Sequence, residues 1–145
     1  MPKVLVQFDG SSKDAAQAAR TVAEGAESVR FTEVEVRALD ARERLADYDG
    51  VVLVVSSAGM NAAAEALAAL TDKVGAVVAP DGADAQSALV AAMLRAGMIV
   101  VGAGTEGEAR TLGARVAKVT EWVRHARSHE HGHSHSHAPT RRGEP

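Results

Sequence analysis

Five histidines recur at every second residue near the C-terminus of the sequence. Imidazole binds nickel, copper and zinc, and the affinity of such sites rises toward copper. A flexible chain can bring three or four imidazoles around one ion, and His125 with His129 could also chelate if the last helix continues that far. We therefore predict nickel, zinc or copper ligands at His129, His131, His133, His135 and His137. The alternative is a solvated polar tail without a metal role.

Hydroxyl, carboxylate and small side chains gather in three segments that each follow an apolar run. The candidate binding residues are Asp9, Gly10, Ser11, Ser12 and Lys13 in the first segment, Ser56, Ser57, Ala58, Gly59, Met60 and Asn61 in the second, and Pro80, Asp81 and Gly82 in the third. Serine hydroxyls and the free N–H groups of a helix start attract an anion, and Lys13 could pair with a phosphate. Asp9 and Asp14 oppose this, because a like charge about 6 Å away costs roughly 3 kcal/mol at an effective dielectric of about 20. An ordinary capped turn is the competing interpretation of the first segment.

The elements that position these segments follow from hydrophobic periodicity. Apolar runs over 4–8, 51–55, 75–79 and 98–101 predict buried strands, and the alternation over 31–39 predicts a strand with one exposed face. Alanine-rich stretches over 12–27, 62–70, 83–95 and 108–127 predict helices. Strands that alternate with helices predict a parallel sheet with right-handed crossovers.

The alternating second strand belongs at an edge of this sheet, because a strand that is exposed on one face cannot lie in its centre. The fold class is therefore α/β, a doubly wound five-stranded parallel sheet of order 2-1-3-4-5, which is the flavodoxin order. Ligands of such sheets bind beyond the carboxyl ends of the strands, at the switch point between strands 1 and 3. All three segments named above are predicted to lie at that edge.

The sequence resembles the flavodoxin-like NAD(P)H:quinone oxidoreductases of the WrbA type. The likeness is carried by residues 3–6 with 19–26, by 46–52, by 96–102 and by 108–117. It implies a bound FMN in the three segments, with NAD(P)H as electron donor and a quinone as acceptor. A metal is the alternative acceptor that we consider. It implies no side-chain catalyst, since the flavin carries the chemistry.

The departures from that family lie in the ligand segments. The resemblance implies a phosphate-binding serine where Gly10 stands, an aromatic near Met60, and a serine- or threonine-rich run where Asp81 stands. The alternative function is a cofactor-free flavodoxin-like domain that handles metal or engages a partner through its histidine-rich tail. Trp122, beside an apolar stripe, could anchor a homo-oligomer.

Composition excludes several other classes. The chain has 145 residues, no cysteine and a formal net charge of -3, which argues against disulfides, thiolate metal sites and nucleic acid as partner. No apolar run is long enough to span a bilayer and no signal-peptide layout precedes the first strand, so we expect no membrane association and a cytoplasmic location. We predict one domain over 1–127 and a disordered tail over 128–145.

Overall fold

The computed structural model describes residues 1–39, 45–56, 63–64, 67, 70–80 and 83–140, with side chains for all of these except 83 and 130–140. In chain order the elements are β1 (Lys3–Phe8), α1 (Lys13–Glu27), β2 (Glu33–Ala38), the short 3₁₀ helix η1 (Leu45–Asp47), β3 (Gly50–Val54), β4 (Val74–Val78), α3 (Ala83–Arg95), β5 (Ile99–Gly104), the short 3₁₀ helix η4 (Glu106–Glu108) and α4 (Ala109–Thr140). The helix predicted over 62–70 falls mostly outside the described residues.

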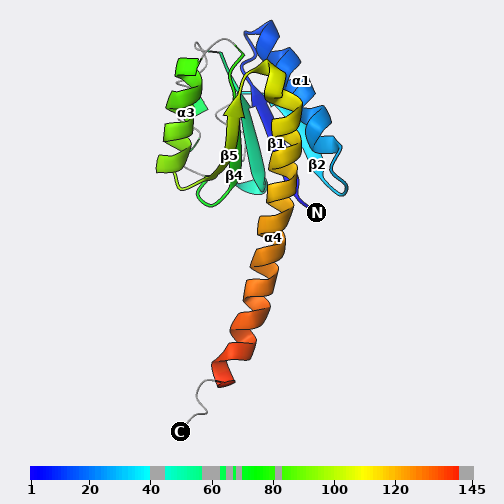
Figure 1. Cartoon of the computed structure of the whole chain (residues 1–145), viewed down its shortest axis with the longest axis vertical. Helices are drawn as coiled ribbons and strands as arrows, with labels where there is room; N and C mark the ends of the chain where they lie inside the picture. Colours follow the sequence, from blue (N-terminus) through cyan, green and yellow to red (C-terminus); the bar gives the residue numbers. More distant parts are fainter. Residues whose placement is uncertain (40–44, 57–62, 65–66, 68–69, 81–82, 141–145) are drawn as a thin grey trace.

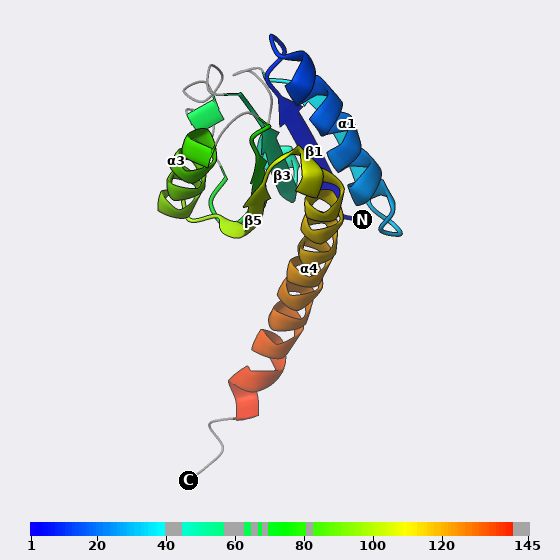
Figure 2. The same ribbon diagram turned by 45° about the horizontal axis from the view of Figure 1, so that its top comes forward.

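The five strands form one parallel sheet in the order β2-β1-β3-β4-β5, as the sequence predicts. Strands β3 and β4 are buried along their whole length, whereas β2 lies at an edge and is largely exposed. Helices α1 and α4 lie side by side on one face of the sheet, and α3 lies on the other (Figures 1 and 2). Apolar runs thus form the central strands β1, β3 and β4, and the alternating segment forms one edge. The apolar run over 98–101, predicted as a buried strand, instead begins β5 at the other edge and is only partly buried.

The sheet separates two apolar cores. One contains valines of β1 and β3 together with the alanine face of α1 and residues Leu112 and Val116 of α4. The other contains Leu5, Leu53 and Val77 under Leu89 and Met93 of α3. Both faces of the central strands are therefore buried, which holds their carboxyl ends in fixed positions.

Helices α1 and α4 approach each other more closely than ordinary side chains permit. A Cβ atom built on Gly25 would lie 2.0 Å from the carbonyl oxygen of Arg110, and one built on Gly113 would lie 2.0 Å from that of Val22. Backbone of each helix thus contacts a glycine of the other. These two glycine contacts hold the first turns of α4 against α1.

Helix α4 continues to Thr140, beyond Arg127 where the sequence predicts that the last helix ends (Figure 1). Apolar periodicity shows where a helix packs against the sheet, but a helix can continue beyond the packed part. Proline is the residue that most disfavours a helix interior, and the first one after Arg127 is Pro139. A disordered tail over 128–145 therefore differs from the helical backbone seen for 128–140, while the division into a domain and a tail stays a prediction. Within the described part of the chain, no helix is long and apolar enough to cross a membrane.

Candidate functional site

Asp9 lies at the switch point, where β1 ends and the chain turns toward α1. Its amide donates to the carbonyl of Val54 at 3.1 Å, which ties the end of β1 to the end of β3. Its carboxylate is nearly buried, with 8% of the residue exposed. The residues that sequence analysis assigns to the first and second binding segments therefore meet at one point.

The carboxylate of Asp9 accepts three hydrogen bonds from these two segments. Oδ1 accepts from the amide of Ser11 at 3.1 Å and from its hydroxyl at 2.8 Å, and Oδ2 accepts from the hydroxyl of Ser56 at 2.6 Å. The hydrogen bond from Ser56 is the largest cause of a pKa of Asp9 below its ordinary value, and those from Ser11 add to it, while burial opposes them. The carboxylate of Asp9 is therefore ionised at neutral pH, and groups of the protein donate the hydrogen bonds that water would otherwise supply.

This lowered pKa predicts an acid-dependent loss of stability. Since the folded state binds the proton of Asp9 less tightly than the unfolded state, the stabilisation is present above the unfolded pKa of about 4 and is lost as pH falls through the folded pKa. Asp9→Asn should therefore lower the urea midpoint at pH 6, and the difference from wild type should shrink toward pH 2. Asp14→Asn, which removes an exposed carboxylate of the same turn, is the control. A difference that stays constant with pH would contradict the assignment.

The start of α1 supplies the remaining groups of the first segment. Ser12 caps the helix, because its hydroxyl accepts from the amide of Ala15 at 3.1 Å, and its own amide donates to the carbonyl of Asp9 at 3.1 Å. Lys13 and Asp14 are exposed, and their amides belong to the first turn that has no intrahelical partner. Gly10 is exposed. The capped turn that the sequence offers as an alternative is thus present.

Fewer of the other predicted residues can be placed. Pro80 follows β4 and is half-buried, next to Ala79, whose amide donates to the carbonyl of Gly104 at 3.0 Å. The predicted binding residues outside the described part of the chain are Ser57, Ala58, Gly59, Met60, Asn61, Asp81 and Gly82. The described site therefore consists of the first segment, Ser56 and Pro80.

The first segment does not fit a phosphate in this arrangement. The hydroxyl and amide of Ser11 and the hydroxyl of Ser56, which an FMN phosphate would use, are all directed at Asp9. The cap hydroxyl of Ser12 accepts a hydrogen bond from the α1 backbone. A phosphate would also face the ionised carboxylate of Asp9 at short range, which is strongly unfavourable.

Gln7, in the strand that leads to Asp9, is a buried polar residue that the sequence analysis does not single out. It is fully buried in β1, two residues before Asp9, and within the described structure neither polar atom of its amide has a hydrogen-bond partner. An unpaired buried polar group costs about 1–3 kcal/mol. The signal in the sequence is a single amide within the apolar run 4–8.

Aromatic side chains contribute little to the described site. Phe8 ends β1 but packs against the core under α1 and α4. Tyr48 donates a hydrogen bond to Glu35 on the edge strand, and Phe31 and Trp122 are exposed. Stacking on a planar ligand is therefore left to the second segment, where Met60 is predicted to lie.

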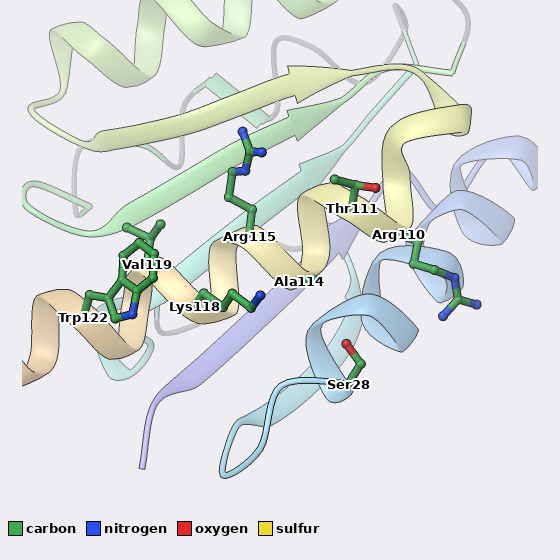
Figure 3. Close-up of a pocket in the computed structure, with 8 residues that line it drawn as sticks. All are labelled: Ser28, Arg110, Thr111, Ala114, Arg115, Lys118, Val119 and Trp122. Carbon is green, nitrogen blue, oxygen red and sulfur yellow. The ribbon is translucent and has the colours of Figure 1, made fainter.

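A separate hollow of about 580 Å³ runs along the outer surface of α4 (Figure 3). Arg110 and Thr111 at one end of it belong to the first turn of α4, and Arg110 is paired with Glu24 at 2.7 Å. The residues that line it are Ser28, Arg110, Thr111, Ala114, Arg115, Lys118, Val119 and Trp122. Asp9, with its hydrogen-bond network, is the better candidate for a site, because it lies at the switch point where ligands of such sheets bind.

The structure describes the side chains of two of the six histidines. His125 and His129 are exposed on α4, and their Nε2 atoms lie 3.0 Å apart. The side chains of His131, His133, His135 and His137 lie outside the described structure. Among described residues, no three or more His, Asp or Glu side chains converge as a metal-binding group.

Comparison with known proteins finds similar structures but no similar sequence. No family model matches the chain, and no curated protein matches it in sequence. A flavodoxin from the domain Archaea is 18% identical with a TM-score of 0.62, over 82% of this chain and 99% of that one. A diflavin flavoprotein from Nostoc sp. is 15% identical with a TM-score of 0.63, over 89% of this chain and 97% of that one. A flavone reductase is 14% identical with a TM-score of 0.67, over 86% of this chain and 65% of that one.

These likenesses show that the chain has the flavodoxin-like fold, as the sequence predicts. At such identities they show the fold alone. The narrower resemblance to the WrbA type stays a prediction.

Proposed function

We propose that this chain is a flavin-binding protein that holds its cofactor at the carboxyl ends of β1 and β3. The observation that carries the proposal is the hydrogen bond between Asp9 and Ser56, since it brings the two binding segments together at the switch point of a flavodoxin-like sheet. The structural neighbours support it, because their names describe a flavodoxin, a diflavin flavoprotein and a flavone reductase.

The form of the flavin follows from the chemistry of the first segment. Since Asp9 occupies the amide and hydroxyl of Ser11 and the hydroxyl of Ser56, we propose that the ring and the ribityl chain provide most of the binding, and that FMN binds more weakly than riboflavin. Ribityl hydroxyls can donate to a carboxylate, whereas a phosphate is repelled by it.

A bound flavin would supply hydride or electron transfer, and the protein would position it. The resemblance found in the sequence makes NAD(P)H the proposed electron donor and a quinone or a metal the proposed acceptor. Homo-oligomerisation and a cytoplasmic location are further proposals from the sequence. Trp122, the predicted anchor of an interface, is 64% exposed.

Fluorescence titration with two flavins tests the proposal. Purified protein at neutral pH and tens of micromolar concentration should quench riboflavin fluorescence, and FMN should bind at least about tenfold more weakly because of the charge of Asp9. Tighter binding of FMN would show that the first segment rearranges around a phosphate. If neither flavin is quenched, the proposal fails.

A second candidate function is a cofactor-free domain that handles metal or a partner through its C-terminal region. The specific observation in its favour is that the carboxylate of Asp9 already satisfies the hydroxyls of Ser11 and Ser56. Because these side chains already satisfy one another's hydrogen-bonding groups, the switch point needs no ligand for that purpose. Absence of quenching with both flavins is the outcome that this candidate predicts.

A further inference from the structure

The imidazoles of His125 and His129 converge on the exposed side of α4. Their Nε2 atoms are 3.0 Å apart, their ring centroids are 4.5 Å apart, and the rings meet edge to face at 76°. Residues four apart lie on the same side of a helix one turn from each other, so the helical backbone itself imposes this arrangement. The arrangement depends on α4 continuing past Arg127, where the sequence predicts a disordered tail.

The separation of the two nitrogens is suited to one metal ion. Imidazole nitrogen binds first-row metals at about 2.0–2.1 Å, so two nitrogens 3.0 Å apart subtend an angle of about 95° at a shared ion. Affinity of imidazole sites for divalent first-row metals rises toward Ni²⁺ and Cu²⁺, so these are the ions we expect at the pair.

We propose that His125 and His129 form a two-histidine chelate for Cu²⁺ or Ni²⁺, with water in the remaining coordination positions. In the metal-free pair, one ring carries a proton on Nε2 and donates it to the other ring. For two neutral rings that proton moves to Nδ1 of its own ring when the ion binds, so both Nε2 lone pairs become available. The site is independent of the proposed flavin, since it uses no residue of the switch point.

The helix is anchored at the site by two arginines. Arg124 pairs with Asp49 at 3.2 Å, and Arg127 donates to the carbonyl of Asp72 at 2.7 Å. Both cations are thereby held toward the body of the protein. His125 lies between them, and His129 follows two residues after Arg127. Glu121 lies one turn before His125, and the two line an open hollow of about 230 Å³.

The test must separate this chelate from binding by the later histidines. In the full chain, replacement of His131, His133, His135 and His137 by alanine leaves His125 and His129 as the remaining imidazoles. We expect this variant to bind one Cu²⁺ per chain by isothermal titration, with two nitrogen ligands in the hyperfine pattern of its electron paramagnetic resonance spectrum. Adding His129→Ala should weaken binding by at least about tenfold, because one imidazole cannot chelate.

A matched control keeps two histidines but removes their spacing. In the same background, Ala126→His combined with His129→Ala places the imidazoles next to each other in sequence, where helical side chains do not face each other. We expect binding as weak as with His125 alone, and circular dichroism verifies that each variant is folded. The proposal is overturned if this control binds Cu²⁺ as tightly as the His125–His129 pair. It is also overturned if loss of the four later histidines abolishes binding.

Discussion

Gly113→Ala should lower the free energy of unfolding by at least about 3 kcal/mol, although alanine is the better residue for a helix by about 1 kcal/mol. The added Cβ would lie 2.0 Å from the carbonyl oxygen of Val22, 2.9 Å from its carbonyl carbon and 3.1 Å from the amide of Ala26. These are backbone atoms of α1, so no side-chain rotation relieves the contact. The helices must separate, which opens the core that they cover. Urea denaturation monitored by circular dichroism measures the change.

Gly25 and Gly107 provide the comparison. Gly25→Ala should destabilise to a similar degree, because its Cβ would lie 2.0 Å from the carbonyl oxygen of Arg110. Gly107→Ala should have an effect within about 0.5 kcal/mol, since the nearest atom to its Cβ is 3.9 Å away in an exposed 3₁₀ helix. If Gly113→Ala unfolds at the same urea concentration as wild type, α1 and α4 do not approach each other this closely.

Asp9→Asn should tighten the binding of FMN by about 10- to 100-fold and leave that of riboflavin within about threefold of wild type. Asparagine removes the negative charge, and its amide can donate to a phosphate while its oxygen still accepts from Ser11. Repulsion of roughly 3 kcal/mol per phosphate charge at about 6 Å sets the upper part of this range. Parallel fluorescence titrations of both flavins measure the two affinities.

Asp14→Asn is the matched control for this charge effect. It removes one negative charge from the same turn, but its side chain is exposed and solvent screens it. We expect FMN affinity to change by less than about threefold. An equal gain in both variants would mean that overall charge, rather than the buried carboxylate of Asp9, limits phosphate binding.

The architecture could be predicted from the sequence because burial leaves a local pattern. A strand covered on both faces reads as an unbroken apolar run, as in β3 and β4, and the edge strand β2 reads as an alternation. Those two patterns are enough to place the strands in order, since connection rules restrict the rest. The position of the ligand edge follows from the order, and with it the assignment of Asp9 and Ser56.

The interactions within the site could not be predicted, because they depend on residues far apart in the chain. Asp9 and Ser56 are 47 residues apart in the chain. The sequence does not show whether the hydroxyl of Ser56 donates to the carboxylate of Asp9 or to a ligand, because that depends on where the fold places the hydroxyl. The same is true of the contact between Gly113 and Val22, which lie on different helices. The spacing of four residues between His125 and His129 is visible in the sequence. The two side chains meet only if the helix continues past Arg127, and apolar periodicity does not show that it does.

Helix α4 runs antiparallel to the strands, so it carries the His125–His129 pair away from the switch point. It begins beside the carboxyl ends of the strands, and Arg124 and Arg127 contact residues just before β3 and β4. From Ala109 to His125 the helix rises about 24 Å. The two-histidine site and the switch point therefore lie toward opposite ends of the strands. The proposed flavin and the proposed metal ion would therefore lie too far apart to contact each other within one molecule.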